Sequence, residues 1–576
     1  MRLQIVKSKN AKSYYMVKST YENGKRSNKV VERLGTEKEI QAKYPNCTSE
    51  EWAKSYVNKK NEEEKLGKEF VIIKNFSPSK TIPKDKQYLY NGGYLFLEKI
   101  YNNLQTEKIC KKISNDYKFE YNLNSILSRL IYSRILSPCS KRSTYEESKK
   151  FIEEPQFECH QIYRALDILT ENKEYIQAEL YKNSKKISNR NTGILYYDCT
   201  NYFFEIEEAE GLKQYGKSKE NRPNPIVQMG LFVDGDGIPL AFNINKGNTN
   251  EQITLKPLEN QILEDFKLSK FIVCTDAGLS SKANKKFNSI QDRAYITTQS
   301  IKKMKSHIKE WSLDTSNFYL DGDNSGTTYD ISKFNEKEKE KYLNEIFHKQ
   351  MYINEDNFEE NLIVTFSFKY QAYQEKIRNE QILRARKLID KNLGKLKKKN
   401  SNDCRRLIKE VVHTDDGEIA EKKIYDIDYD VIKEETKYDG YYAVCTNLED
   451  EAKEIIKVNK NRWQIEESFR IMKTEFKARP VYLRNDNRIE AHFLICYMAL
   501  LIYRLFEKET DNKYTCEENI KTLKNMNFYK INGEGYVPTY TRTDITDYFH
   551  DKFGFRTDFE IVTNKNLKKI LKVIKK

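Results

Sequence analysis

The feature that most constrains the fold is the order of apolar segments that begins at Gly193. The stretch "GILYYDCTNYFFE" is an apolar strand that ends in an acid, and "PIVQMGLFVDGDGIPLAFNINKG" is a strand pair around a glycine-containing turn. Helical and strand patterns then alternate through "NEQITLKPLENQILEDF", "KFIVCTDAGLSS", "SKANKKFNSI" and "AYITTQS". The order of strand, strand, strand, helix, strand, helix, strand predicts a mixed α/β sheet.

The remaining chain divides by its periodicity and charge. We expect an N-terminal β-hairpin region at 1–65 with a turn at Asn23-Gly24, and a helical region at 66–190. We assign 191–302 and 451–510 to the α/β core, 303–450 to a basic, strand-rich insertion, and 511–576 to a basic C-terminal region. The helical region, with its many Arg and Lys residues, suits duplex DNA, although a structural helical layer is an equal alternative.

The basic balance of the chain favours a polyanionic partner. The formal net charge is +15, and the stretch Lys369–Lys409 holds fourteen Lys/Arg against four Asp/Glu. The last residues, "NKNLKKILKVIKK", carry six lysines and no acid. Such runs are commonly solvated faces or tails, but within a basic chain they favour nucleic acid.

Other features indicate the compartment. The N-terminus lacks a signal-peptide core, and the ten cysteines contain no CxxC pair. The longest apolar stretch, Phe493–Phe506, is too short to span a bilayer and predicts a buried helix. We therefore expect a cytoplasmic protein, associated with the nucleoid, that has reduced thiols and no membrane partner.

Two aspartates follow apolar strands. Asp198 ends "ILYYD", and Asp276 ends "FIVCTD". Functional sites in open α/β sheets form at the ends of strands, so these two acids are candidates. Among 86 acidic residues, two such coincidences would be weak evidence on their own.

A later helix, "NRWQIEESFRIMK", strengthens the case. At about 100° per residue, Arg462, Glu466 and Lys473 project from one narrow stripe, whereas Glu467 lies about 100° further round. An Arg–Glu pair at this spacing is commonly a surface salt bridge. A carboxylate flanked by two cations also suits a metal site that binds phosphates.

These residues resemble the DDE transposases of bacterial insertion sequences. The closer resemblance is to the group of the insertion-sequence-four superfamily that has a long strand-rich insertion before the glutamate helix. That superfamily has a motif of Tyr, two residues, Arg, three residues, Glu, six residues and Lys. Arg462, Glu466 and Lys473 match it, whereas Asn459 replaces the tyrosine. Further similar stretches are "GKSKENRPNPIVQMGLFVDGDGIPLAFNINKGNTNEQ", "DAGLSS", "YDGYYAVCTN" and "RIEAHFLICYMALLIYR".

The resemblance implies an RNase H-like catalytic core, interrupted by the insertion and preceded by the β-hairpin and a helical DNA-binding region. It implies DNA transposition, with Asp198, Asp276 and Glu466 as catalytic residues and ligands of Mg²⁺, for which Mn²⁺ would substitute. Double-stranded DNA, both element ends and target, would be the partner of a homodimer. Expected DNA contacts are Arg462, Lys473, Asn459, Lys397, Lys398 and Lys399.

Two alternatives stay open. One is an RNase H-like nuclease without strand transfer, although such an enzyme would not need the long basic insertion. The other is a DNA-binding regulator derived from a transposase, against which the intact acids argue. For Trp311 and His492 we expect core positions, with a role of Trp311 against an extruded base as the alternative.

Overall fold

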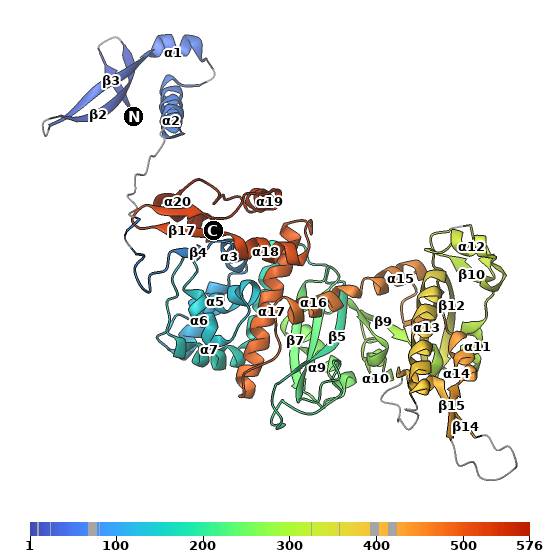
Figure 1. Ribbon diagram of the computed structural model, residues 1–576. Coiled ribbons are helices and arrows are strands. Elements are labelled where there is room, and N and C mark those ends of the chain that lie inside the picture. Colours follow the sequence, from blue (N-terminus) through green and yellow to red (C-terminus); the bar gives the residue numbers. More distant parts are fainter. Residues whose placement is uncertain are drawn as a thin grey trace. The chain divides into compact units, whose positions relative to one another are not determined.

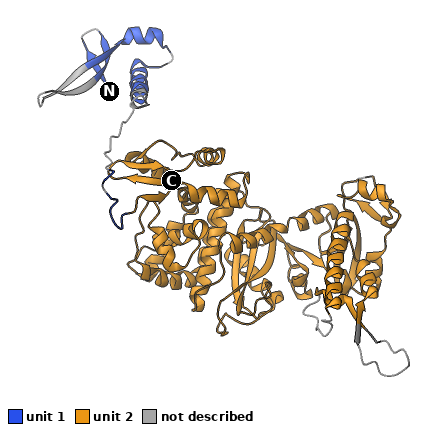
Figure 2. Cartoon of the chain, in the orientation of Figure 1, with its two compact units in different colours: residues 1–86 blue, residues 87–576 orange. Residues whose placement is uncertain are grey.

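The computed structural model describes residues 1–8, 11–22, 25–45, 47–66, 78–79, 81–323, 325–355, 357–391, 402–412 and 423–576. The chain forms two compact units, residues 1–86 and residues 87–576 (Figure 2). Each unit has a hydrophobic core of its own, so each is described separately.

The first unit is a three-stranded antiparallel sheet with two helices. Tyr14, Ile40 and Ala53 are buried in its core, and Trp52 packs against them. Asn23 and Gly24, for which the sequence predicts a turn, lie outside the described residues. The elements are β1 (Arg2–Lys7), β2 (Lys12–Glu22), β3 (Lys25–Thr36), α1 (Glu37–Lys43) and α2 (Ser49–Leu66).

The second unit begins with a short strand and a layer of helices. The side chains of Asn122 and Ser140 cap α5 and α6 by accepting hydrogen bonds from backbone N–H groups three residues on. The elements are β4 (Leu89–Asn91), α3 (Tyr94–Asn103), α4 (Thr106–Tyr117), α5 (Leu123–Leu136), α6 (Lys141–Ser148), α7 (Cys159–Glu171) and α8 (Lys173–Ile187).

A mixed sheet follows, in the predicted order of strands and helices. β5 pairs antiparallel with β6 and parallel with β8, and β8 pairs parallel with β9. A tight turn joins β6 to β7, where Gly237 has a φ of +76° that a side chain would strain. The elements are β5 (Ile194–Phe203), β6 (Ile226–Asp234), β7 (Pro239–Lys246), α9 (Leu255–Asp265), β8 (Phe271–Thr275), α10 (Lys282–Phe287) and β9 (Arg293–Gln299).

Five described strands of the 303–450 segment extend this same sheet, and the other two, β14 and β15, form a separate two-stranded sheet. The order of the extended sheet is β11-β10-β12-β13-β16-β9-β8-β5-β6-β7, so β16 joins the edge of β9 and the others follow outward. Helix α13 lies beside these strands (Figure 1). The elements are α11 (Ser306–Leu313), β10 (Phe318–Leu320), β11 (Thr328–Tyr329), α12 (Glu336–Lys341), β12 (Phe347–Glu355), β13 (Phe358–Phe366), α13 (Phe368–Asp390), β14 (Ile408–Val412), β15 (Lys423–Ile427), α14 (Tyr429–Thr436) and β16 (Tyr441–Thr446).

Three helices return the chain to the sheet: α15 (Ala452–Lys460), α16 (Trp463–Thr474) and α17 (Asp486–Glu509). Helix α17 packs against α3, α5, α7 and β7, and therefore lies between the helical layer and the sheet (Figure 1). By length and composition α17 could cross a membrane, with a mean hydropathy of 1.6, but 89% of its apolar window is buried inside the protein. The buried helix predicted from Phe493–Phe506 is confirmed, but the expectation that it is too short to span a bilayer was wrong, because the helix continues beyond the apolar stretch at both ends to 24 residues.

The C-terminal region packs back on the helical layer. Strands β17, β18 and β19 complete a four-stranded sheet with β4. The lysine-rich end forms an amphipathic helix, with Leu567, Ile570 and Ile574 buried, rather than a free tail. The elements are α18 (Cys516–Asn525), β17 (Asn527–Ile531), β18 (Gly535–Pro538), α19 (Asp544–Phe553), β19 (Val562–Thr563) and α20 (Asn564–Ile574).

Candidate active site

Asp198 lies inside β5 rather than at its end. The strand continues to Phe203, and Asp198 is paired with Leu231 of β6. The prediction of a strand-end position was therefore wrong. The reason is that the residues after Asp198 keep the buried pattern of the strand and continue its pairing with β6.

Asp276 directly follows β8, as predicted. It caps the short turn Ala277–Leu279, where its Oδ1 accepts hydrogen bonds from the backbone N–H groups of Gly278 (3.0 Å) and Leu279 (3.2 Å). Since β5 and β8 are neighbouring parallel strands, the two aspartates lie at adjacent positions of the sheet. The turn fixes the Asp276 carboxylate before any ligand binds.

The Asp198 carboxylate is mostly buried, with 15% of its side chain exposed. Burial raises its pKa to about 6; the nearby Lys219 ammonium lowers the pKa and the Asp276 carboxylate raises it again. The backbone N–H of Cys199 donates a hydrogen bond of 2.7 Å to Oδ1. Two neighbouring carboxylates, one of them mostly buried, attract a cation.

Lys219 supplies positive charge next to these carboxylates. Its Nζ lies 3.9 Å from Asp198 Oδ1 and 3.4 Å from Glu251 Oε1, and it donates a hydrogen bond to the carbonyl of Cys199. Lys219 belongs to the loop between β5 and β6. We did not predict a role for Lys219 or Glu251, although Lys219 lies within the stretch "GKSKENRPN" on which the resemblance rests.

Glu466 lies on the first turn of α16 and forms an ion pair with Arg462, with 3.2 Å between Nη2 and Oε1. Glu466 is 59% exposed at its side chain, whereas Arg462 is 21% exposed. The positive charge of Arg462 also acts on Asp198, whose pKa it lowers. Arg462 thus interacts with acids of both the sheet and the helix.

Glu467 points elsewhere, as its position on the helix predicts. Its two carboxylate oxygens each accept a hydrogen bond of 2.7 Å from Arg470. Its partner is therefore on its own helix.

Lys473 ends near the aspartates from the other end of α16. Burial, helped by the neighbouring Lys219, lowers its pKa to about 8, while Asp198 raises it. Its Nζ lies 3.6 Å from Glu220 Oε1 and 5.5 Å from the centre of the Tyr202 ring. Glu220 also pairs with Arg479, so one carboxylate is shared by two cations.

Asn459, which replaces the motif tyrosine, is buried at the end of α15. Its Nδ2 donates a hydrogen bond of 3.3 Å to the hydroxyl of Tyr442 on β16. The Tyr442 hydroxyl in turn lies 2.5 Å from Thr298 Oγ1, and Tyr442 raises the pKa of Arg462 against the lowering effect of burial. Tyr442 of β16 therefore lies beside Asn459 and Arg462, and no local sequence pattern could reveal this contact.

The other candidate residues have different outcomes. Lys397, Lys398 and Lys399 lie outside the described residues, so their role stays a prediction. His492 is buried, and its Nε2 lies 3.1 Å from the carbonyl oxygen of Ala478, as expected of a core histidine. Trp311 packs partly buried beside β12 and β13, with the Lys349 ammonium 4.7 Å from its ring centre.

Two of the candidate carboxylates fit divalent metal ions. Asp198 and Asp276 offer oxygen ligands and mutually unfavourable negative charge at adjacent strands. Within the described ranges, no three His, Cys, Asp or Glu side chains are close enough to hold a metal ion. The structure therefore brings Asp198 and Asp276 together but leaves Glu466 paired with Arg462.

A cavity of about 380 Å³ borders Glu466. It is lined by aromatic and basic side chains, among them Tyr370, Tyr442, Lys460, Arg462 and Trp463, and Trp463 is 52% exposed. Rings and cations together suit the bases and phosphates of a nucleic acid.

Comparison with models of protein families gave a match. The model of a family described as "Transposase DDE domain" matches residues 203–502, just over half of the 576-residue chain. Asp276, Glu466 and Arg462 lie inside the match, and Asp198 lies shortly before it. The sequence matches no curated protein.

Among solved structures, a cryo-EM structure of a piggyBac transposase synaptic complex with hairpin DNA is similar at 10% identity and a TM-score of 0.33, over 84% of each chain. Both values are too low for the fold or function of this chain to be inferred from that structure.

Proposed function

We propose a DNA transposition reaction for this chain, which belongs to the transposase DDE domain family. In this reaction the protein binds the terminal inverted repeats of its element, cuts the ends and joins their 3′ ends to target DNA. DNA cleavage is the activity of this family; binding of the repeats and strand transfer are the parts proposed here. The observation that carries the proposal is that Asp198, which lies beside Asp276, interacts with three cations, Lys219, Arg462 and Lys473.

We further propose that the catalytic core is RNase H-like and belongs to the insertion-sequence-four superfamily. In support, β7, β6 and β5 are antiparallel neighbours, while β8 and β9 continue parallel to β5. The glutamate helix α16 packs against β5 and β6. The insertion before it adds strands to the same sheet.

Asp198, Asp276 and Glu466 would hold the divalent ions that DDE transposases use, here Mg²⁺, with Mn²⁺ as a substitute. Such ions, when bound, activate the attacking hydroxyl and stabilise the leaving oxygen. Asp276 is held ready by its two backbone hydrogen bonds. Asp198 is held by the N–H of Cys199, and the Lys219 ammonium lies 3.9 Å from its Oδ1.

Arg462 and Glu466 would change partners when DNA binds. A DNA phosphate is a strong partner for an arginine, because the guanidinium can bind it through two hydrogen bonds. Arg462 would then release Glu466, whose carboxylate would turn towards the aspartates. Lys473, now held by Glu220, would contact a second phosphate. The complex with double-stranded DNA would contain two copies of the chain.

Substitution of each aspartate tests the proposal. The substrate is DNA that carries the sequences flanking the gene, cut with Mg²⁺ or Mn²⁺. We expect Asp198→Asn and Asp276→Asn to lower cleavage by several orders of magnitude, because an amide does not supply the charge that a divalent ion needs. DNA affinity and folding should be preserved. Burial raises the pKa of Asp198, so removal of its charge should not destabilise the fold at neutral pH.

Asp265→Asn is the matched control, since Asp265 is exposed at the end of α9. Normal cleavage by either Asp198→Asn or Asp276→Asn would show that the acids are misassigned. Cleavage without joined products by the unsubstituted chain would show instead a nuclease without strand transfer.

A further inference from the structure

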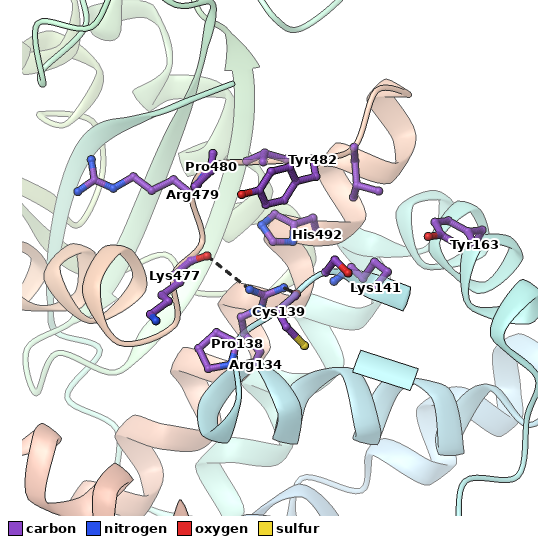
Figure 3. Close-up of a pocket in the computed structure, with 13 residues that line it drawn as sticks. Arg134, Pro138, Cys139, Lys141, Tyr163, Lys477, Arg479, Pro480, Tyr482 and His492 are labelled. Atoms are coloured by element: carbon purple, nitrogen blue, oxygen red, sulfur yellow. Dashed lines mark hydrogen bonds between the residues drawn. The ribbon is translucent and has the colours of Figure 1, made fainter. Parts of the chain in front are cut away.

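A cavity of about 360 Å³ lies between the helical layer and the segment that follows α16 (Figure 3). Its volume is within the range of about 300–1,000 Å³ that is typical of small-ligand sites. Arg134, Cys139 and Lys141 line it from the end of α5 and the start of α6, and Lys477, Tyr482 and His492 line it from the opposite side.

The lining is cationic and contains no acid. None of the thirteen residues around this cavity is Asp or Glu, whereas Arg134, Lys141, Lys477 and Arg479 are basic. Of these, Arg479 is paired with Glu220, and Lys477 is exposed. Arg134 and Lys141 differ from these two residues, because both are buried and neither is paired with a carboxylate of the described chain.

Lys141 lacks a counter-ion among the described residues. It is 5% exposed, and in the described part of the chain its Nζ has no hydrogen-bond partner. Burial and the neighbouring Arg134 lower its pKa to about 7, and no carboxylate raises it. An unpaired buried ammonium beside a second buried cation is unfavourable, so the site is electrostatically prepared for an anion.

Arg134 is fixed but incompletely bonded. Its guanidinium donates hydrogen bonds to the carbonyls of Phe476 and Cys139, both at 3.2 Å, while in the described chain its Nε–H has no partner. His492 does not add charge, because burial and the two cations hold its pKa well below the usual value. Helix α6 begins at Lys141, and its N-terminal N–H groups add positive potential.

A pair of salt bridges links the lining of this cavity to the candidate active site. The segment that lines it follows α16 directly, and Arg479 of this segment shares the Glu220 carboxylate with Lys473. A DNA strand that reaches Lys473 could therefore continue to the cavity. The helical layer, which precedes the matched family region, contributes Arg134 and Lys141.

We propose that this cavity binds a phosphate group of DNA, with Lys141 and Arg134 as its ligands. The part of this proposal that names DNA as the source of the phosphate rests on the proposed function, whereas the part that assigns an anion site does not. The same two cations would also accept inorganic phosphate, so experiments must separate the two sources.

The first experiment measures the thermal stability of the full chain with and without inorganic phosphate. The variants are Lys141→Met and Lys141→Gln, and the control is Lys149→Met, which removes the charge of an exposed lysine next to the end of the same helix. Phosphate should raise the Tm of the unsubstituted chain and of the control but not of the Lys141 variants. Without phosphate, Lys141→Met should have a higher Tm than the unsubstituted chain, because an unpaired buried cation is removed.

The second experiment measures the affinity for a short duplex of arbitrary sequence at several salt concentrations. Each phosphate neutralised contributes a slope of about −0.9 in log affinity against log salt. Lys141→Met should therefore have a slope shallower by about 0.9 than Lys149→Met. A shallower slope supports a DNA phosphate in the cavity, whether or not inorganic phosphate raises the Tm.

Two results would overturn the inference. If phosphate raises the Tm but Lys141→Met leaves the slope of log DNA affinity against log salt unchanged, DNA is excluded as the source and the cavity binds a free anion. If phosphate does not raise the Tm and the slope is also unchanged, the cavity binds no phosphate. Neither experiment requires DNA cleavage, and Asp276→Asn should retain both responses, so failure of the proposed function would be distinguishable.

Discussion

At the scale of single residues, Glu466 and Glu467 are sequence neighbours with different partners. Glu466 pairs with Arg462, which also acts on Asp198, whereas Glu467 pairs with Arg470 on its own helix. We expect Glu466→Gln to lower cleavage by several orders of magnitude, because the amide keeps the shape but not the charge that a metal ion needs. Glu467→Gln should change cleavage little, since such surface pairs contribute at most about 1 kcal/mol.

The two glutamine variants form a matched pair. Cleavage should be measured on uncut and pre-cut DNA ends, with Mg²⁺ and Mn²⁺, and DNA binding should be measured separately. Equal losses in the two variants, or a larger loss for Glu467→Gln, would contradict the assignment and also that of Arg462 and Lys473.

The residue pattern predicted only part of this site. Helical spacing placed Arg462 and Glu466 together, and the structure has them in an ion pair. Lys219 and Tyr442 could not be found in this way. Lys219 lies in an irregular loop, where no period relates a residue to a direction, and Tyr442 reaches Asn459 through the pairing of β16 with β9.

At the scale of elements, the local order from β5 to β9 could be predicted because each of these segments has an apolar strand pattern or a helical period of its own. The outer half of the sheet could not. β16 pairs with β9 only after the whole 303–440 segment, so its partner depends on long-range pairing rather than on a local signal. The end of β5 was also missed, because an acid within a buried strand resembles the acid that ends one.

The basic connection between α13 and β14 gives a prediction at this scale. Lys397, Lys398 and Lys399 lie in it, outside the described residues. If this connection binds DNA phosphates, replacement of all three by Gln should make the slope of log affinity against log salt shallower, by up to about 0.9 for each phosphate that is no longer neutralised. Replacement of Lys337, Lys339 and Lys341, which lie on α12, is the control for the same loss of charge. An unchanged slope would assign the run to a solvated surface.

At the scale of the whole molecule, the positive charge is unevenly divided between the two units. Residues 1–86 contain twenty Lys/Arg and eleven Asp/Glu, a net charge of +9 out of +15 for the chain. The buried core of the second unit contains no residue from the first, as far as the described residues go. The first unit therefore supplies more than half of the net charge and none of that core.

This division predicts that affinity and stability can be separated. A chain that begins at Gln87 should keep the thermal transition of the second unit, because its core is intact. Its affinity for duplex DNA should fall, and the salt dependence should become shallower, because fewer counterions are released when a less basic chain binds. Loss of the thermal transition would show that the second unit depends on the first. An unchanged salt slope would show that the first unit does not lie on DNA, and the DNA-binding residues would then have to come from the candidate site, the helical layer and the basic connection after α13.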